Sequence, residues 1–346
     1  MSADKTDAGR REGTQGFQAV PRGRARRFGR FARLAGGVAG NMLAHGAVQL
    51  AAGKRPRAKD LLLTPKNAMK LTRQLAEMRG AAMKLGQIFS MDTGDLLPRE
   101  LADILETLRD RGYAMPDAQL EEVLIEGLGA DYADKLRHFE REPFAAASIG
   151  QAHRLRTRDG RAAVLKVQYP GIRESIDSDV DNLASLLSMS GLLPKHMDMA
   201  PMLEEAKTQL HEEADYEQEA RYLKAFVRAL GDDERFLIPR LIPHLSATRI
   251  LGMTYVPGIP IEEVARETAA ERSRVLGLLF ELLMIELFQL RLVQTDPNFA
   301  NYRYHATTGQ VALLDFGASR RFKVGLIRSY RELLVAAIDS DRPAMI

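Results

Sequence analysis

The sequence predicts an α+β fold with two lobes, because helical and strand-rich segments occupy different parts of the chain. Residues 64–140 carry apolar positions at alternate spacings of four and three, as on one face of a helix. After about residue 141, branched residues and Pro-Gly pairs become frequent, as in strands joined by turns. The 346 residues are enough for two lobes around one cleft, or for two modest domains.

Residues 1–60 form a basic, glycine-rich arm. No acidic residue occurs between Gly13 and Lys59, and arginines and lysines flank the apolar run 34–50. This asymmetry indicates an anionic partner. We expect membrane lipid rather than nucleic acid.

The run 34–50 is slightly short for a membrane span. Three polar residues share one helix face of it: Asn41, His45 and Gln49. An amphipathic helix in the membrane interface fits at least as well as a span, and the alternative is a disordered tail leading into a soluble helix. Gly36 and Gly40 would let two such helices approach closely, so a homodimer through this helix is a further expectation.

The first residues include Asp4, Asp7 and Glu12, so they resemble neither a secretory signal peptide nor a mitochondrial presequence. Together with the abundance of arginine and alanine, this predicts a bacterial cytoplasmic protein, peripheral to or anchored in the inner membrane.

Three further stretches follow the arm: a helical extension at 61–140, a strand-rich lobe at 141–256 and a mainly helical lobe at 257–346. Strands are predicted at 163–169, 237–242, 248–256 and 311–314. Helices are predicted at 174–190, 200–229 and 261–292. The chain ends soon after the last predicted strand, so we expect the second lobe to be truncated.

Composition excludes several classes of protein. The absence of cysteine rules out disulfides, cysteine-ligated metals and thiol catalysis. The seven histidines lack an HExxH spacing, which argues against a zinc hydrolase.

The strongest catalytic pattern lies near the end of the chain. Asp296 and Asn301 have the D-x-x-x-x-N spacing of a kinase catalytic loop, and Asp315 opens an Asp-Phe-Gly sequence after a buried strand. Mg²⁺ prefers hard oxygen ligands, here the Asp315 carboxylate and the Asn301 amide oxygen. Asp296 could orient an attacking hydroxyl or water or accept its proton. Alone, the Asp-Phe-Gly sequence would be a common strand-end turn.

Upstream, Lys166 follows Val164 and Leu165 on a predicted strand, as the lysine does in the V-A-I-K element of kinases. That lysine would bridge nucleotide phosphates and an acidic residue of a helix. The alternative is an exposed strand lysine.

Further motifs occur in a fixed order. They are Lys84-Leu85-Gly86-Gln87, the alanine-rich segment Ala145-Ala146-Ala147-Ser148, and Glu213-Ala214-Asp215 followed by Glu219. With Gln294-Thr295-Asp296 and the Asp-Phe-Gly sequence, they resemble the ABC1/COQ8/UbiB family of atypical kinases, in its COQ8-like branch. The resemblance covers roughly residues 84–320 and implies an atypical protein-kinase-like two-lobed fold with an N-terminal helical KxGQ extension.

The resemblance implies roles for individual residues. The segment Ala145–Ser148 would replace a glycine-rich phosphate loop and bias against protein phosphorylation, since alanine restricts the backbone more than glycine does. Lys166 would contact the phosphates of ATP or ADP and pair with Glu219. Backbone groups near Tyr255 and Val256 would bind adenine.

The extension would have a regulatory role. Lys84 is implied to reach Glu213 and Asp215, and with Gln87 to cover the site where a protein substrate would dock. The alternative is that Lys84 and Gln87 only solvate a helix, although Gly86 costs a helix about 1 kcal/mol relative to alanine.

Three functional readings remain open. The first is a Mg²⁺-dependent atypical ATPase that supports ubiquinone biosynthesis at a membrane, with the enzymes or intermediates of that pathway as partners. The second is a kinase of a small molecule, lipid or protein, against which the absence of an Ala-Pro-Glu motif weighs for peptide substrates. The third is a non-catalytic scaffold that binds nucleotide and lipid.

Overall fold

The computed structural model describes residues 78–92, 114–190, 199–296 and 298–345. The chain divides into two compact units. The first comprises residues 1–123, 141–153 and 168–211, and the second comprises 124–140, 154–167 and 212–346. The arm at 1–60, with Gly36 and Gly40, lies outside the described residues. So does most of the helical stripe predicted before residue 78.

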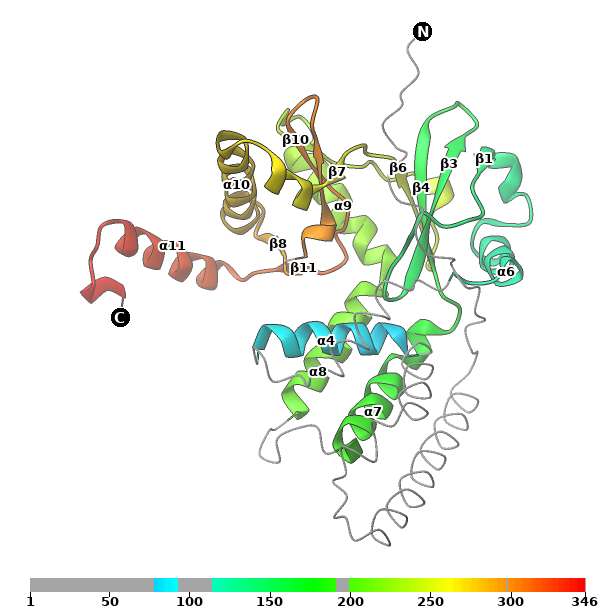
Figure 1. The fold of residues 1–346 in the computed structure, drawn as a ribbon, viewed down its shortest axis with the longest axis horizontal. Helices are drawn as coiled ribbons and strands as arrows, with labels where there is room; N and C mark the ends of the chain where they lie inside the picture. The colour runs from blue at the N-terminus through cyan, green and yellow to red at the C-terminus, as the bar shows by residue number, and fades with distance from the viewer. Residues whose placement is uncertain (1–77, 93–113, 191–198, 297, 346) are drawn as a thin grey trace, which may run out of the picture. The chain divides into compact units, whose positions relative to one another are not determined.

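Helices dominate the described part of the first unit (Figure 1). They are α4 (Arg79–Asp92), the first part of α6 (Asp117–Leu128), α7 (Ile172–Ser190) and most of α8 (Ala200–Glu213). The buried apolar side chains here are Met78 just before α4 and Ala81, Ala82 and Leu85 within it, and α4 packs against α7. Lys207 of α8 forms an ion pair with Asp181 of α7, and Nε2 of His211 on α8 lies 2.9 Å from Oδ1 of Asp177 on α7.

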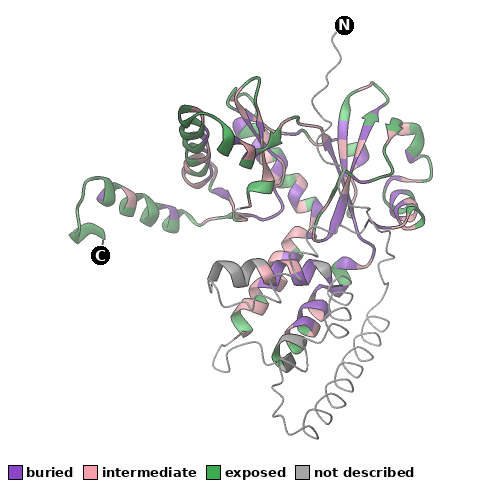
Figure 2. Ribbon diagram, in the orientation of Figure 1, coloured by how far each residue is buried: buried purple, intermediate pink, exposed green. Residues whose placement is uncertain are grey.

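The larger sheet is five-stranded. It is built from β1 (Leu136–Phe139), β2 (Ala145–Ala146), β3 (Gly150–Thr157), β4 (Ala162–Gln168) and β6 (Ile250–Thr254). The order is β1-β3-β4-β6, with β2 paired to β3. β4 and β6 are antiparallel, and Lys166 lies opposite Leu251. Buried residues gather on these strands and on helix α9 (Tyr216–Leu230), which packs against β6 (Figure 2).

Helix α9 is amphipathic for a clear sequence reason. Its buried residues recur at spacings of three and four: Tyr216, Glu219, Leu223, Phe226 and Leu230. Asp215 caps the N-terminus by accepting a hydrogen bond from the Gln218 backbone N–H at 2.9 Å. The one charged side chain on the buried face, Glu219, therefore has a position fixed by apolar packing on either side.

Two smaller sheets lie in the second unit. One has the order β5-β10-β9-β7, from β5 (Phe236–Leu237), β10 (Gln310–Leu313), β9 (Tyr302–His305) and β7 (Ile259–Pro260). The other pairs β8 (Leu292–Gln294) with β11 (Ser319–Arg321) in antiparallel fashion.

The remaining helical elements of the second unit are α10 (Ala269–Met284), a π-helical segment η5 (Ile285–Leu290) and α11 (Val324–Ile338). Short 3₁₀ turns are η2 (Tyr132–Lys135), η3 (Pro243–Leu245), η4 (Ile261–Arg266), η6 (Phe299–Asn301) and η7 (Pro343–Met345). No helix among the described residues has both the length and the apolar character needed to cross a membrane.

Four predicted elements were wrong in part. The single helix predicted at 200–229 is broken after Glu213 into α8 and α9, because Asp215 caps the start of a new helix. The helical stretch 64–140 ends before strand β1. The strand predicted at 237–242 is only Phe236–Leu237, because Pro239 and Pro243 lack the backbone N–H that a longer ladder needs. The helix predicted at 261–292 is divided into η4, α10 and the π segment before β8 begins.

Candidate functional site

Lys166 lies at the centre of the candidate site and donates to two carboxylates. Its Nζ atom lies 2.5 Å from Oε1 of Glu219 and 2.6 Å from Oδ2 of Asp315. All three residues belong to the second unit. The Glu219 side chain is 2% exposed, whereas that of Asp315 is 36% exposed and so accessible to a ligand. The structure therefore places Lys166 against Glu219, as the resemblance implied, and adds Asp315 to the same cluster.

The two carboxylates reach Lys166 from elements far apart in the sequence. Glu219 lies in the first turn of α9, and Asp315 follows strand β10. The rings of Phe226 on α9 and Phe316 next to Asp315 pack with centroids 5.1 Å apart. This aromatic contact holds the two acidic residues on the same side of the core.

Burial and charge act in opposite directions on this cluster. Burial alone would lower the pKa of Lys166, but the charges of Asp315 and Glu219 outweigh it and raise that pKa above its ordinary value. Burial raises the pKa of Glu219, with a further contribution from Asp315, against the opposing effect of Lys166. One ammonium shared by two carboxylates leaves a net negative charge, which favours binding of a further cation.

Asp296 and Asn301 form a second cluster. The Asn301 side-chain amide donates to Oδ2 of Asp296 at 3.1 Å and to the Asp296 carbonyl at 3.3 Å. The backbone N–H of Leu314 donates to the Asn301 carbonyl at 2.9 Å. This bond ties the catalytic-loop sequence to the residue before Asp315. The side-chain oxygen of Asn301 forms no hydrogen bond among the described residues and could serve as a ligand.

Gln294 joins the two clusters through its side chain. Its amide accepts from the Asp296 backbone N–H at 3.0 Å and donates to the Asp315 carbonyl at 3.1 Å. The Gln294 backbone N–H in turn donates to Oε2 of Glu286 at 3.0 Å. From the sequence, Gln294 was noted only as part of the Gln294-Thr295-Asp296 motif, and its bridging position was missed.

Glu286 was also missed. It is 3% exposed and lies in the π segment that precedes β8. Burial raises its pKa to about 7, and the hydrogen bond from Gln294 only partly opposes this. Burial, with the charges of Glu286 and Asp296, also raises the pKa of Tyr302. The available signal was an acidic residue inside the very apolar run 275–290.

Gly317 lies close to the acidic end of α9. Its N–H donates to Oδ1 of Asp315 at 3.0 Å. A side chain here would come within 3.6 Å of the Glu219 carboxylate and 3.8 Å of the Glu213 α-carbon. Asp215, predicted to be regulatory, caps α9 in this structure.

The alanine-rich segment forms a tight turn within the first unit. Ala145 and Ala146 pair with β3, and the Ala147 N–H donates to the Gly150 carbonyl at 2.8 Å. The backbone of Gly80 on α4 is so close that a β-carbon there would lie 3.1 Å from the carbonyl oxygen of Ser148. Helix α4 and this turn are therefore in direct contact.

Lys84 and Gln87 both belong to α4, and Lys84 is buried. Glu213 and Asp215 are residues of the second unit, so the pairing of Lys84 with them stays a prediction.

The predicted adenine-binding residues follow strand β6. The Tyr255 N–H donates to the Ala162 carbonyl at 3.1 Å, and the Arg154 guanidinium lies 5.9 Å from the centroid of the Tyr255 ring. The Tyr255 carbonyl and the Val256 N–H take part in no hydrogen bond within the described part of the chain.

Residues 107–346 match the ABC1 atypical kinase-like domain. The chain belongs to the ABC1 family. The family match confirms the predicted atypical-kinase-like α+β fold. In this chain, that fold brings Lys166, Glu219 and Asp315 together.

Relatives of this ABC1 chain include the atypical kinase COQ8 of Saccharomyces cerevisiae, 38% identical over 323 residues, and the atypical kinase COQ8B of Rattus norvegicus, 38% identical over 329 residues. Both relatives are described as mitochondrial. The matches cover 93% and 94% of this chain but 64% and 62% of the relatives. The ABC1 chain therefore spans less than two thirds of their length.

Among solved structures, Rv3197 of Mycobacterium tuberculosis, determined as a complex with erythromycin, is similar at a TM-score of 0.55. The sequences are 26% identical, and the match covers 81% of this ABC1 chain and 71% of that protein.

A magnesium nucleotide suits the donors of this site. Asp315 and Asn301 offer hard oxygen atoms, and Mg²⁺ is usually held by one or two carboxylates together with substrate phosphates and water. Within the described ranges, no group of three or more histidine or acidic residues is arranged to hold a metal by itself.

Proposed function

We propose that this chain is a Mg²⁺-dependent nucleotide-binding atypical kinase or ATPase that supports ubiquinone biosynthesis at a membrane. The observation that carries the proposal is the cluster in which Lys166 is shared by Glu219 and Asp315, linked through Gln294 to Asp296. A lysine held by an acidic residue of a helix, beside the aspartate of an Asp-Phe-Gly sequence, is what phosphoryl transfer requires of a kinase-like fold. The kinship with COQ8 proteins supports the pathway.

In this proposal each residue has a distinct part. Lys166 neutralises phosphate oxygens while Glu219 orients it, and Asp296 orients the attacking hydroxyl or water. Asn301 and Asp315 hold Mg²⁺, which neutralises charge on the phosphates when bound. The carbonyl of Tyr255 and the N–H of Val256 bind adenine.

The alanine turn and α4 limit which acceptor can enter. Ala145, Ala146, Ala147 and Ser148 lie beside the phosphates and, being less permissive than glycines, disfavour the loop conformations of ordinary protein kinases. Lys84 and Gln87, with Glu213 and Asp215, restrict access by a protein substrate. Hydrolysis of ATP, or transfer to a small or lipid acceptor, is then preferred to protein phosphorylation.

The remaining expectations belong to the same proposal. The domains are the arm at 1–60, the extension at 61–140 and lobes at 141–256 and 257–346. The arm binds anionic lipid, with a homodimer through the Gly36 and Gly40 helix. Enzymes or intermediates of ubiquinone synthesis are partners, and the site of action is the cytoplasmic face of a bacterial inner membrane.

The test is ATP hydrolysis with and without anionic liposomes, comparing the wild type with Asp315→Asn. Hydrolysis that requires Asp315 and rises with liposomes supports the proposal. Phosphotransfer to an added small-molecule, lipid or protein acceptor supports the kinase reading. Nucleotide binding without turnover by the wild type supports a non-catalytic scaffold.

A further inference from the structure

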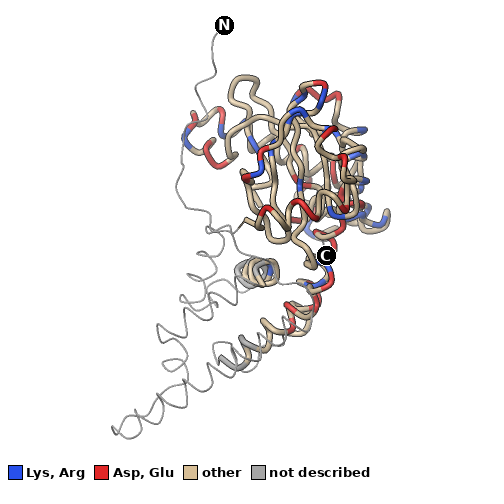
Figure 3. The backbone as a smooth tube through the Cα atoms, turned by 90° about the vertical axis from the view of Figure 1, so that its right-hand side faces the viewer, with Lys and Arg blue, Asp and Glu red and all other residues tan. Residues whose placement is uncertain are grey.

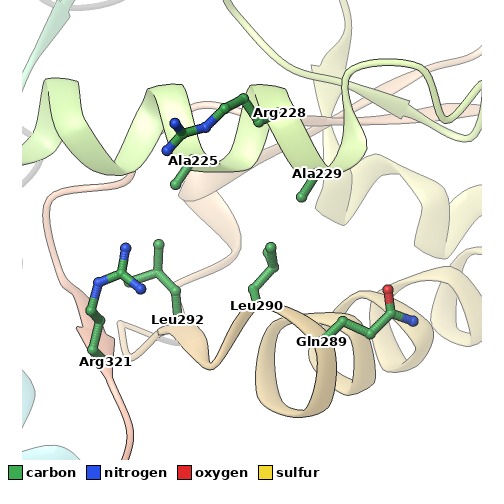
Figure 4. Close-up of a pocket in the computed structure, with 7 residues that line it drawn as sticks. All are labelled: Ala225, Arg228, Ala229, Gln289, Leu290, Leu292 and Arg321. Carbon is green, nitrogen blue, oxygen red and sulfur yellow. The ribbon is translucent and has the colours of Figure 1, made fainter.

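A pocket lies in the second unit and is lined by none of the residues around Lys166. Its volume is about 270 Å³. It is lined from α9 by Ala225, Arg228 and Ala229, from the π segment by Gln289 and Leu290, and from β8 and β11 by Leu292 and Arg321. Figure 4 shows the guanidinium groups of Arg228 and Arg321 at one end of the pocket, near Ala225, and Gln289 at the other end.

The two arginines have charges without a partner. Neither Arg228 nor Arg321 forms an ion pair or side-chain hydrogen bond within the described ranges. Charges of both signs are interspersed along this unit (Figure 3), and the arginines at 235, 274 and 320 each pair with an acidic residue. Arg228 and Arg321 are both exposed, so their guanidinium groups are open to a ligand. Two guanidinium forks at one end of a pocket are suited to a multi-oxygen anion such as phosphate.

The rest of the pocket is mainly apolar. Ala225, Ala229, Leu290 and Leu292 contribute aliphatic surface between the arginines and Gln289. The pocket volume exceeds that of a single phosphate group, so a bare anion would leave the apolar side chains of the pocket exposed to water. A ligand that combines a phosphate group with an apolar chain would use both parts, since pockets of this kind bind through apolar area and a few polar contacts.

Each wall of the pocket also carries a residue of the candidate active site. Helix α9 bears Arg228 on the pocket and Glu219 beside Lys166. In the β8–β11 pair, Arg321 lies opposite Leu292 at the pocket. At the other end of the same pair, Ser319 lies opposite Gln294. The side chain of Gln294 bridges Asp296 and Asp315. The π segment supplies Leu290 to the pocket and Glu286 to Gln294.

We propose that this pocket binds a phosphate group carried on an apolar chain, and that the bound phosphate links α9 to β11 through Arg228 and Arg321. Such a link restrains α9, which carries Glu219, relative to the β8–β11 pair, which carries Gln294, and so orders the nucleotide site before nucleotide binds. The binding site stands on the pocket itself, whereas its effect on nucleotide binding rests on the proposed function. Coupling of this kind must be reciprocal, so nucleotide should also strengthen binding of the phosphate ligand.

The test uses calorimetry on the full chain without nucleotide. The probes are inorganic phosphate, dihexanoyl phosphatidic acid and dihexanoyl phosphatidylcholine. The first two distinguish a free phosphate from a lipid phosphate, and the last two distinguish a phosphomonoester from a zwitterionic head group. We expect dihexanoyl phosphatidic acid to bind more tightly than either of the others. The double variant Arg228→Gln/Arg321→Gln should lose about tenfold or more in affinity, since each tenfold is only about 1.4 kcal/mol.

Two further variants separate loss of the site from loss of folding. Ala229→Leu fills the pocket but keeps both arginines, and it should also weaken binding of dihexanoyl phosphatidic acid. The double variant Arg240→Gln/Arg328→Gln removes the same charge from exposed positions and should bind as the wild type does. Circular dichroism of each variant checks that the fold is retained.

Three results would overturn the binding site. They are wild-type affinity in both pocket variants, equal affinity for inorganic phosphate and dihexanoyl phosphatidic acid, and loss of binding in Lys166→Gln, which would place the phosphate in the nucleotide site. Affinity for ATP is then measured with and without dihexanoyl phosphatidic acid. An unchanged ATP affinity overturns the coupling. A chain that binds the lipid probe but no nucleotide contradicts the proposed function and leaves the pocket standing.

Discussion

The ammonium of Lys166 lies 2.6 Å from the carboxylate of Asp315. In the proposed function Lys166 contacts phosphate and Asp315 contacts Mg²⁺, so this ion pair has to separate when a nucleotide enters. Without a metal, the Asp315 carboxylate both competes for Lys166 and repels the phosphates.

Asp315→Asn should therefore bind metal-free ADP more tightly than the wild type, by about tenfold for a gain near 1.4 kcal/mol. The affinity is measured by calorimetry with EDTA present. Asp232→Asn, at an exposed position, is the control and should behave as the wild type. Equal or weaker binding of ADP by Asp315→Asn would show that the carboxylate does not oppose the phosphates.

Glu286→Gln tests the buried carboxyl behind the catalytic loop. The pKa of Glu286 is raised from 4.5 to about 7, so between these values the folded state binds more protons than the unfolded state. Stability contributed by this group is then lost as pH rises through this window. The variant should gain stability relative to the wild type between pH 5 and pH 8, by at most about 3 kcal/mol.

The measurement is urea unfolding of both proteins across that pH range. Glutamine keeps an oxygen to accept the Gln294 N–H, so the hydrogen bond itself is preserved. A stability difference that does not change with pH would mean that Glu286 titrates normally.

Phe226→Ala removes the ring that packs on Phe316 and opens a cavity between α9 and the segment carrying Asp315. Phe226 is fully buried, so the free energy of unfolding should fall by about 3–5 kcal/mol. Leu276→Ala, on the exposed face of α10, should change it by less than about 0.5 kcal/mol. Similar small effects for both variants would refute the role given to the aromatic contact.

Gly80→Ala probes the contact between α4 and the alanine turn. Alanine normally stabilises a helix over glycine by about 1 kcal/mol. At Gly80 the new β-carbon would lie 3.1 Å from the Ser148 carbonyl oxygen, while at Gly277 in α10 it meets nothing within 4 Å. Thermal unfolding should show Gly277→Ala stabilised and Gly80→Ala unchanged or destabilised. Equal stabilisation of the two would mean that α4 does not rest on the turn.

Ala147→Gly should alter nucleotide preference and raise autophosphorylation, because glycine frees a turn in which no alanine has positive φ. Binding of ATP and ADP and incorporation of labelled phosphate are measured. Ala130→Gly, an exposed alanine, controls for the chemical change. An unaltered nucleotide profile in Ala147→Gly would count against the role of the alanine turn.

Sequence located the groups around Lys166 because each lies in a short local motif at the end of a recognisable strand or helix. The shared position of Lys166 between Glu219 and Asp315 follows once those motifs belong to one kinase-like fold. The helix predicted at 174–190 was found for the same reason, since its apolar spacing is strong, whereas the one predicted at 200–229 is two helices, α8 and α9.

The β8–β11 pair could not be predicted from sequence. Both strands have three residues, too few to show alternation, and their pairing joins positions far apart in the chain. Glu286 was missed because an acidic residue in a helical pattern is normally on the surface, and its burial depends on tertiary packing. The bridging position of Gln294 was missed because it depends on the β8–β11 pairing, which places its side chain near Asp296 and Asp315.

The most direct test of the central claim is electron paramagnetic resonance of Mn²⁺, a substitute for Mg²⁺, titrated into the chain with ATP present. The wild type should hold bound Mn²⁺ that is lost in Asp315→Asn and weakened in Asn301→Ala, with the Asp232→Asn control unaffected. Mn²⁺ and ATP bound equally by all four proteins would contradict the assignment of Asn301 and Asp315 as the residues that hold the metal nucleotide.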